Sequence, residues 1–267
     1  MKTDNRILVE KRGHVATLTF NRPEVLNAFS AGMGKLMADW LQELNDDPDV
    51  RVLIFTGAGK GFCSGKDLKS ANDLSRPAPR SPYRMLNFNE HNIASIRSFA
   101  KPTIAAVNGV AVGAGLGVSV ACDLRIASPT ARFSAIFAKR GIPAQDAVGA
   151  FLPQIVGLPK ALELLYTARM VEADEALAMG LVNEIVSAEH LLDRAMEIAE
   201  TIAQGPPLAL AMIKQVVYRG LGRSADDQLA LQALGTYINL ANAADDVREA
   251  SAAFREKRPP RFKGHAE

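Results

Sequence analysis

The chain has 267 residues, a formal net charge of +2, and 31 basic against 29 acidic residues. This balance of charges argues against a nucleic-acid partner, because proteins that bind nucleic acids have a strongly basic surface. Cys63 and Cys122 are the only cysteines, which excludes a disulfide framework and favours the reducing cytoplasm. The first residues are polar and the apolar runs are short, so we expect no targeting peptide and no membrane partner.

The predicted elements alternate between strands and helices. Residues 7–9 and 15–20 are rich in β-branched side chains and flank Gly13, which predicts a hairpin. Ser30 is the expected N-cap of a helix that ends near residues 46–48 and carries the apolar stripe Met33, Met37, Trp40, Leu41 and Leu44. Strands at 52–55, 103–107 and 124–127, a helix near 89–99 and a glycine-rich helix between the last two strands complete an α/β pattern.

The segment 69–84 interrupts this pattern with Pro77, Pro79 and Pro82. Such a segment is a loop, either a solvated connection or a lid over a substrate. From residue 191 the chain is predicted to be helical, and Pro206 and Pro207 begin a new segment. In the first of these helices, Leu192, Ala195, Ile198 and Ile202 are expected to share one face, and this part of the chain is expected to be an interaction surface.

Two glycine-rich loops follow apolar strands. Residues 107–117 read VNGVAVGAGLG and open a helix, whose first N–H groups have no intrahelical partner and face negative charge favourably. Residues 57–68 read GAGKGFCSGKDL and allow a similarly close approach of the backbone. Together they predict an oxyanion hole, with tight strand-to-helix packing as the alternative. A dinucleotide-binding turn fits poorly, because Val118 stands where the third glycine would be needed.

Four segments carry a resemblance to a known family. They are NRPEVLNA at 21–28, FCSGKDL at 62–68, the stretch 106–123 and MGLVN at 179–183. In this order they resemble the crotonase family, also called the enoyl-CoA hydratase/isomerase superfamily. The resemblance implies a spiral of strand-strand-helix repeats, with an acyl-CoA-binding core over residues 1–190. It also implies a helical oligomerisation region over residues 191–267 that joins homotrimers or homohexamers.

The resemblance further implies an acyl-CoA thioester substrate and no cofactor or metal, since coenzyme A belongs to the substrate. The backbone N–H groups of Lys66 and Ala114 would hold the thioester carbonyl and stabilise an enolate. Basic residues near the 69–84 loop and the tail 256–263 would lie near coenzyme A. The implied substrate-binding residues are Leu26, Ala28, Ser64, Lys66, Asp67, Leu68, Gly113, Ala114, Gly117 and Phe137.

The acid and base depart from the hydratase pattern. Hydratases of this family carry glutamates at the positions of Gly117 and Phe137, and neither residue here can titrate. Isomerases of this family carry an acid at the position of Gln145. We predict that its neighbour Asp146 is the base. The alternative is that Asp146 only caps a helix. We therefore expect double-bond isomerisation. The alternatives are hydration by unusual groups such as Asp146 and Gln145, or a silent acyl-CoA binder.

Overall fold

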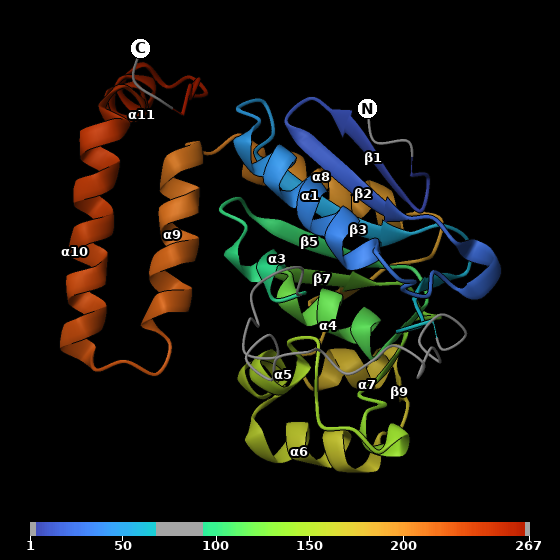
Figure 1. Cartoon of the computed structure of the whole chain (residues 1–267). Coiled ribbons are helices and arrows are strands. Elements are labelled where there is room, and N and C mark those ends of the chain that lie inside the picture. The colour runs from blue at the N-terminus through green and yellow to red at the C-terminus, as the bar shows by residue number, and fades with distance from the viewer. Residues whose placement is uncertain (1–3, 68–92, 265–267) are drawn as a thin grey trace, which may run out of the picture.

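The computed structural model describes residues 4–67 and 93–264, which form two sheets surrounded by helices (Figure 1). The larger sheet contains, in hydrogen-bonded order, β1 (Ile7–Arg12), β2 (Val15–Phe20), β3 (Val52–Gly57), β5 (Thr103–Val107), β7 (Leu124–Ala127) and β10 (Glu184–Ile185). Strands β1 and β2 are antiparallel and the remaining pairs are parallel. The predicted hairpin and the predicted strands at 103–107 and 124–127 are confirmed.

The smaller sheet contains, in order, β4 (Gly61–Cys63), β6 (Val110–Val112), β8 (Arg132–Ser134) and β9 (Val171–Glu172). Three times the chain leaves a strand of the larger sheet and immediately enters one of the smaller sheet: β3 to β4, β5 to β6 and β7 to β8. Helical segments follow each of these passages. The α/β fold with strand-strand-helix repeats is thereby confirmed.

The helices surround these sheets. In chain order they are η1 (Pro23–Val25), α1 (Met33–Asp46), α3 (Ser95–Ser98), α4 (Ala114–Ala121), η3 (Ala138–Arg140), α5 (Val148–Val156), α6 (Leu158–Thr167), α7 (Ala173–Ala178), α8 (Leu191–Ala203), α9 (Pro207–Gly220), α10 (Ala225–Asn242) and α11 (Ala244–Glu256). None of the helices within the described residues is long and apolar enough to cross a membrane.

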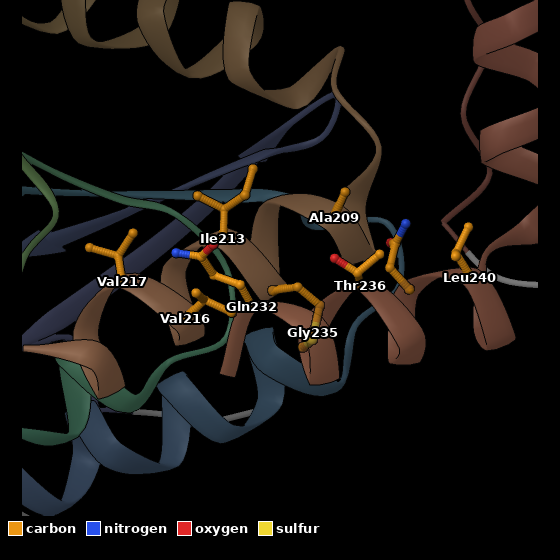
Figure 2. A pocket seen from close by; sticks show the side chains of 10 residues that line it. Ala209, Ile213, Val216, Val217, Gln232, Gly235, Thr236 and Leu240 are labelled. Carbon is orange, nitrogen blue, oxygen red and sulfur yellow. The ribbon is translucent and has the colours of Figure 1, made fainter. Parts of the chain in front are cut away.

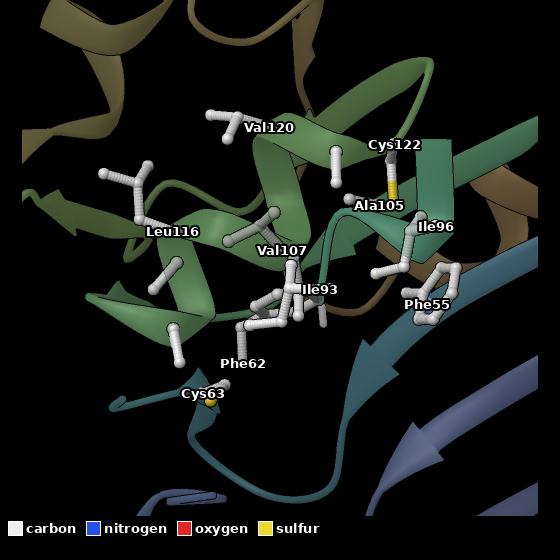
Figure 3. Packing of buried hydrophobic residues seen from close by; sticks show 14 of the residues in the cluster. Phe55, Phe62, Cys63, Ile93, Ile96, Ala105, Val107, Leu116, Val120 and Cys122 are labelled. Atoms are coloured by element: carbon white, nitrogen blue, oxygen red, sulfur yellow. The ribbon is translucent and has the colours of Figure 1, made fainter. Parts of the chain in front are cut away.

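Side chains alternate between the two faces of a strand, and both faces of the central strand β3 are buried. On β3, Leu53 and Phe55 join a core with α1 and α4, whereas Val52 and Ile54 pack against α8 on the other face. Figure 1 shows α1 and α8 on these opposite faces. Figure 3 shows part of the first core, with Leu116 on α4 close to the elements that carry Phe62 and Cys63.

Two details of the sequence-based prediction are wrong. Ser30 does not cap α1: the N-cap is Gly32, and the Ser30 hydroxyl accepts a hydrogen bond from Arg6 at 2.7 Å instead. On α8, Leu192 does not share the buried face: it is 44% exposed. The buried residues are Leu191, Ala195, Ala199 and Ala203, and the predicted Ile198 and Ile202 pack against them. Small alanines let this helix lie close to the sheet. Leu68, the 69–84 loop and the first part of the predicted helix at 89–99 lie outside the described residues.

Helix α8 thus contributes to the covering of the sheet, and the helices that extend from the core begin at α9. Figure 1 shows α9 and α10 as an antiparallel pair at one side of the molecule. The division of the chain at residue 190 stays a prediction.

Asp123, between α4 and β7, anchors α9 to the core. Its carboxylate accepts hydrogen bonds from the Thr103 backbone N–H at 2.7 Å and from the Tyr218 hydroxyl at 2.8 Å, and it pairs with Lys214 at 2.9 Å. The Lys214 side chain is only 5% exposed. Burial lowers the pKa of Lys214, which its contact with Asp123 opposes.

We expect Asp123→Ala to lower the free energy of unfolding by about 3–5 kcal/mol, because it leaves a buried ammonium group without its counter-charge. Urea denaturation followed by circular dichroism measures the effect. Glu197→Ala is the control, because that carboxylate is 69% exposed in its pair with Arg194 and its loss should change the midpoint little. Equal midpoints for the two variants would contradict the anchoring role.

Candidate active site

The glycine-rich loop at 57–68, called the first loop below, is hydrogen-bonded to the segment after η1. Phe29 forms an isolated parallel bridge with Lys66, in which the Phe29 N–H donates to the Gly65 carbonyl and the Asp67 N–H donates to the Phe29 carbonyl. Successive N–H groups of an extended segment alternate in direction. The N–H of Lys66 therefore points away from Phe29.

Two asparagines that the sequence prediction did not single out shape this loop. The buried Asn27 amide donates to the carbonyls of Ala58 and Gly61, at 2.9 and 2.6 Å. Asn108 donates to the carbonyls of Gly57 and Gly59 and accepts from the Gly57 N–H. Asn27 adopts a positive φ of 58°, a conformation in which asparagine is common. An asparagine at position 27, within a turn, was the feature of the sequence that could have indicated this role.

The second loop lies directly against the first. A Cβ atom on Gly65 would lie 2.9 Å from the Val112 carbonyl oxygen and 3.8 Å from the Ala114 backbone nitrogen. Gly65 and Gly113 have φ values of 98° and 55°, which favour glycine. Ala114 is the first residue of α4, so its N–H has no acceptor within the helix. The structure therefore brings together the two chain segments predicted to carry the oxyanion donors.

Asp146 lies over Gly117 of α4. A Cβ atom at Gly117 would come within 2.1 Å of the Asp146 carbonyl oxygen, so no larger residue fits there while Asp146 keeps this position. Asp146 and Ala147 both have positive φ values, 53° and 68°, and such strain in non-glycine residues is concentrated at functional sites. Asp146 does not cap α5: the N-cap is Ala147, without a side-chain hydrogen bond.

The Asp146 carboxyl group is partly withdrawn from water, with 17% of its side chain exposed. Burial raises the pKa of Asp146, and the nearby charge of Lys66 opposes this rise. The Lys66 ammonium lies 4.0 Å from the Asp146 carboxylate and donates a hydrogen bond to the Gln145 side chain at 3.2 Å. A raised pKa suits a general base that works near neutral pH.

The other predicted residues lie around the two loops. Ser64 donates its backbone N–H to Leu26, and its hydroxyl donates to Val25. Asp67 pairs with Arg22 at 3.0 Å, and the same guanidinium donates to the Ala28 carbonyl.

Phe137 is 4% exposed, lies at the start of η3 and belongs to the main core. Its carbonyl accepts from Ile142, which links it to the segment that leads to Asp146. Whether the ring touches a substrate stays a prediction.

Cys63 offers no nucleophile at this site. Its side chain is fully buried, and burial raises the pKa of the thiol to about 12, so that the thiolate is scarce at neutral pH. Within residues 4–67 and 93–264, no group of three or more His, Cys, Asp or Glu side chains is arranged to hold a metal ion.

Comparisons with known proteins agree with this geometry. The family model for enoyl-CoA hydratase/isomerase matches residues 10–265. The 1,2-epoxyphenylacetyl-CoA isomerase of Escherichia coli K12 is 36% identical over 94% of this chain and 95% of its own. The short-chain-enoyl-CoA hydratase of Clostridium acetobutylicum is 36% identical over 95% of this chain and 96% of its own.

Solved structures give the same result. The enoyl-CoA hydratase from Bacillus anthracis superimposes with a TM-score of 0.85 at 31% identity, covering 97% of this chain and all of that chain. The family assignment rests on these relatives, and it agrees with the two facing glycine-rich loops and with the strand-strand-helix repeats. The chain belongs to the enoyl-CoA hydratase/isomerase family of the crotonase superfamily.

Proposed function

We propose that this protein is an enoyl-CoA isomerase that stabilises a thioester enolate between the backbone N–H groups of Lys66 and Ala114. Asp146 is the base. The single observation that carries the proposal is that Asp146 occupies the space beside Gly117, where a side chain at 117 would otherwise lie. A fixed donor aimed at a developing oxyanion contributes roughly 3 kcal/mol.

The proposed reaction moves one proton. The Asp146 carboxylate removes a proton from the α-carbon of a 3-enoyl thioester, and the electrons of that C–H bond enter a dienolate whose negative charge rests on the thioester oxygen. Asp146 then returns the proton to the γ-carbon, which gives the 2-enoyl thioester. The reaction is balanced without an added electron carrier or metal, so we propose no cofactor; coenzyme A is part of the substrate.

Isomerisation is favoured over hydration because hydration is served by two ionisable groups around one water. Gly117 and Phe137 stand at the two positions where the resemblance places glutamates, and neither can donate or accept a proton. The relatives include both an isomerase and a hydratase, so hydration remains an outcome that the experiment must be able to detect. The cytoplasmic location that we also propose is supported by the two free, buried cysteines.

Asp146→Asn should lower α-proton exchange by about 10²–10⁴-fold, because the amide cannot accept the proton. Mass spectrometry in heavy water would follow deuterium uptake on saturated, 2-enoyl and 3-enoyl thioesters of several chain lengths. Asp193→Asn is the matched control, since that side chain is 85% exposed on α8. Retained exchange in Asp146→Asn would exclude Asp146 as the base, and gain of water by the wild type would establish hydration.

Gly117→Ala should reduce exchange at least tenfold and lower the free energy of unfolding by about 1–3 kcal/mol, because the added methyl group must displace the Asp146 backbone. Thermal denaturation and the same exchange assay measure the two effects. The control is Gly220→Ala, where the new Cβ would lie 3.4 Å from the flexible Gln228 side chain. Unchanged activity in Gly117→Ala would mean that the position of Asp146 is unimportant.

We also propose that the protein assembles with copies of itself as a trimer or hexamer through residues 191–267. Helices α9 and α10 border an apolar groove, and Ile213, Val217 and Leu240 on its lining are 60%, 56% and 51% exposed. Figure 2 shows these side chains along the two helices. Exposed apolar surface of this kind favours association.

The double variant Ile213→Asp/Val217→Asp should shift the assembly toward smaller species, because association would bury two carboxylates in an apolar contact. Light scattering after size exclusion measures the mass of wild type and variant. Leu158→Asp is the control, since Leu158 is 60% exposed on α6, outside this groove. A monomeric wild type would contradict the proposed assembly.

A further inference from the structure

We infer that the Lys66 side chain is a positioning residue, which ties the first oxyanion loop to the segment that carries Asp146 and keeps the Asp146 carboxylate ionised. This inference rests on the proposed function, in which Asp146 is the base. It assigns a second task to a residue whose backbone N–H is already a proposed donor. The two tasks are separable, because every substitution at Lys66 except proline retains the backbone N–H.

The contact spans two segments far apart in the chain. The Lys66 ammonium donates to the Gln145 side chain at 3.2 Å and lies 4.0 Å from the Asp146 carboxylate. Gln145 in turn accepts the backbone N–H of Val148 at its carbonyl, at the first turn of α5. One lysine thus reaches two successive residues, Gln145 and Asp146, just before Ala147, the N-cap of α5. Asp146 and Ala147 both hold positive φ values.

The charges around Asp146 give the ammonium its electrostatic role. The positive charge of Lys66 favours the Asp146 carboxylate, and the buried thiol of Cys63 also lies near enough to interact with it. Gly117, the part of α4 nearest to Asp146, has no side chain. Lys66 is therefore the nearby positive charge that offsets the burial of the carboxylate.

Three variants separate the effect of the Lys66 charge from that of its hydrogen bond to Gln145. Lys66→Met removes both, Lys66→Arg keeps the charge, and Gln145→Leu removes the hydrogen bond while leaving the ammonium in place. In Lys66→Met the pKa of Asp146 should rise, because a favourable positive charge is lost. The acidic limb of the pH profile of kcat/KM for α-proton exchange should then move to higher pH. At a pH on that limb, kcat/KM should fall roughly two- to fivefold; the effect is small because the Lys66 side chain is half-exposed.

Lys66→Arg should restore the wild-type acidic limb, and Gln145→Leu should leave that limb in place. A merely structural lysine would lower activity evenly at all pH values and would not move the limb. A direct measurement accompanies the kinetics: the carboxyl carbon of Asp146 is titrated by NMR on ¹³C-aspartate-labelled protein and is identified by its loss in Asp146→Asn.

The NMR titration does not depend on turnover, so it remains informative if no thioester is exchanged. A titration midpoint in Lys66→Met equal to that of the wild type overturns the inference. If Asp146→Asn retains exchange, the assignment of Asp146 as the base is wrong. The midpoint of the NMR titration of the Asp146 carboxyl carbon still decides whether Lys66 pairs with Asp146. If Asp146→Asn loses exchange and the profile of Lys66→Met superimposes on the wild type, only the role of Lys66 is wrong.

Discussion

The close approach of the Asp146 main chain to Gly117 is the constraint on which the site depends. A helix with a side chain at this position would hold the segment 141–147 away from α4, since a Cβ would meet the Asp146 carbonyl at 2.1 Å. With glycine present, the segment settles onto the same helix whose first N–H group is a proposed oxyanion donor. The proposed base and the proposed donor thus both lie against α4, all of whose residues are buried.

The site divides its work between main chain and side chains. Its donors are backbone groups, positioned by asparagines and by paired loop segments such as Phe29 and Lys66. Its proposed acid-base chemistry uses one carboxylate, in a segment that ends at the first turn of α5. A fold built in this way can retain its means of stabilising an enolate while the proton-moving side chains change, which is why family membership alone does not name the reaction.

Much of the fold could be predicted from local pattern. The segments that form β2, β5 and β7 are short, mostly apolar and bounded by polar or turn residues, so their limits could be predicted from the sequence. The N-cap of α1 was not, because whether the Ser30 hydroxyl bonds to its own helix or to Arg6 depends on the β1 strand that brings Arg6 alongside. Likewise, α8 turns its alanines to the sheet rather than Leu192 because close packing outweighs side-chain size.

The candidate site was predictable in its loops but not in its contacts. Glycines at 65 and 113 marked places of close backbone approach, and the resemblance indicated which residues to compare. Nothing in the spacing of Lys66 and Gln145, which are 79 positions apart, indicates that their side chains meet. The reason for glycine at 117 was equally hidden, because it lies in a contact with a backbone atom of a distant loop.

The crowding at Gly117 also limits how this protein could change its chemistry over time. A glutamate acquired at 117 would not simply add a second ionisable group, because it would first have to expel the loop that supplies the existing one. A step that places a second carboxylate at 117 is therefore a loss before it is a gain. A lineage descending from this sequence would need a compensating change in residues 141–147 beforehand, so the order of mutations matters as much as their identity.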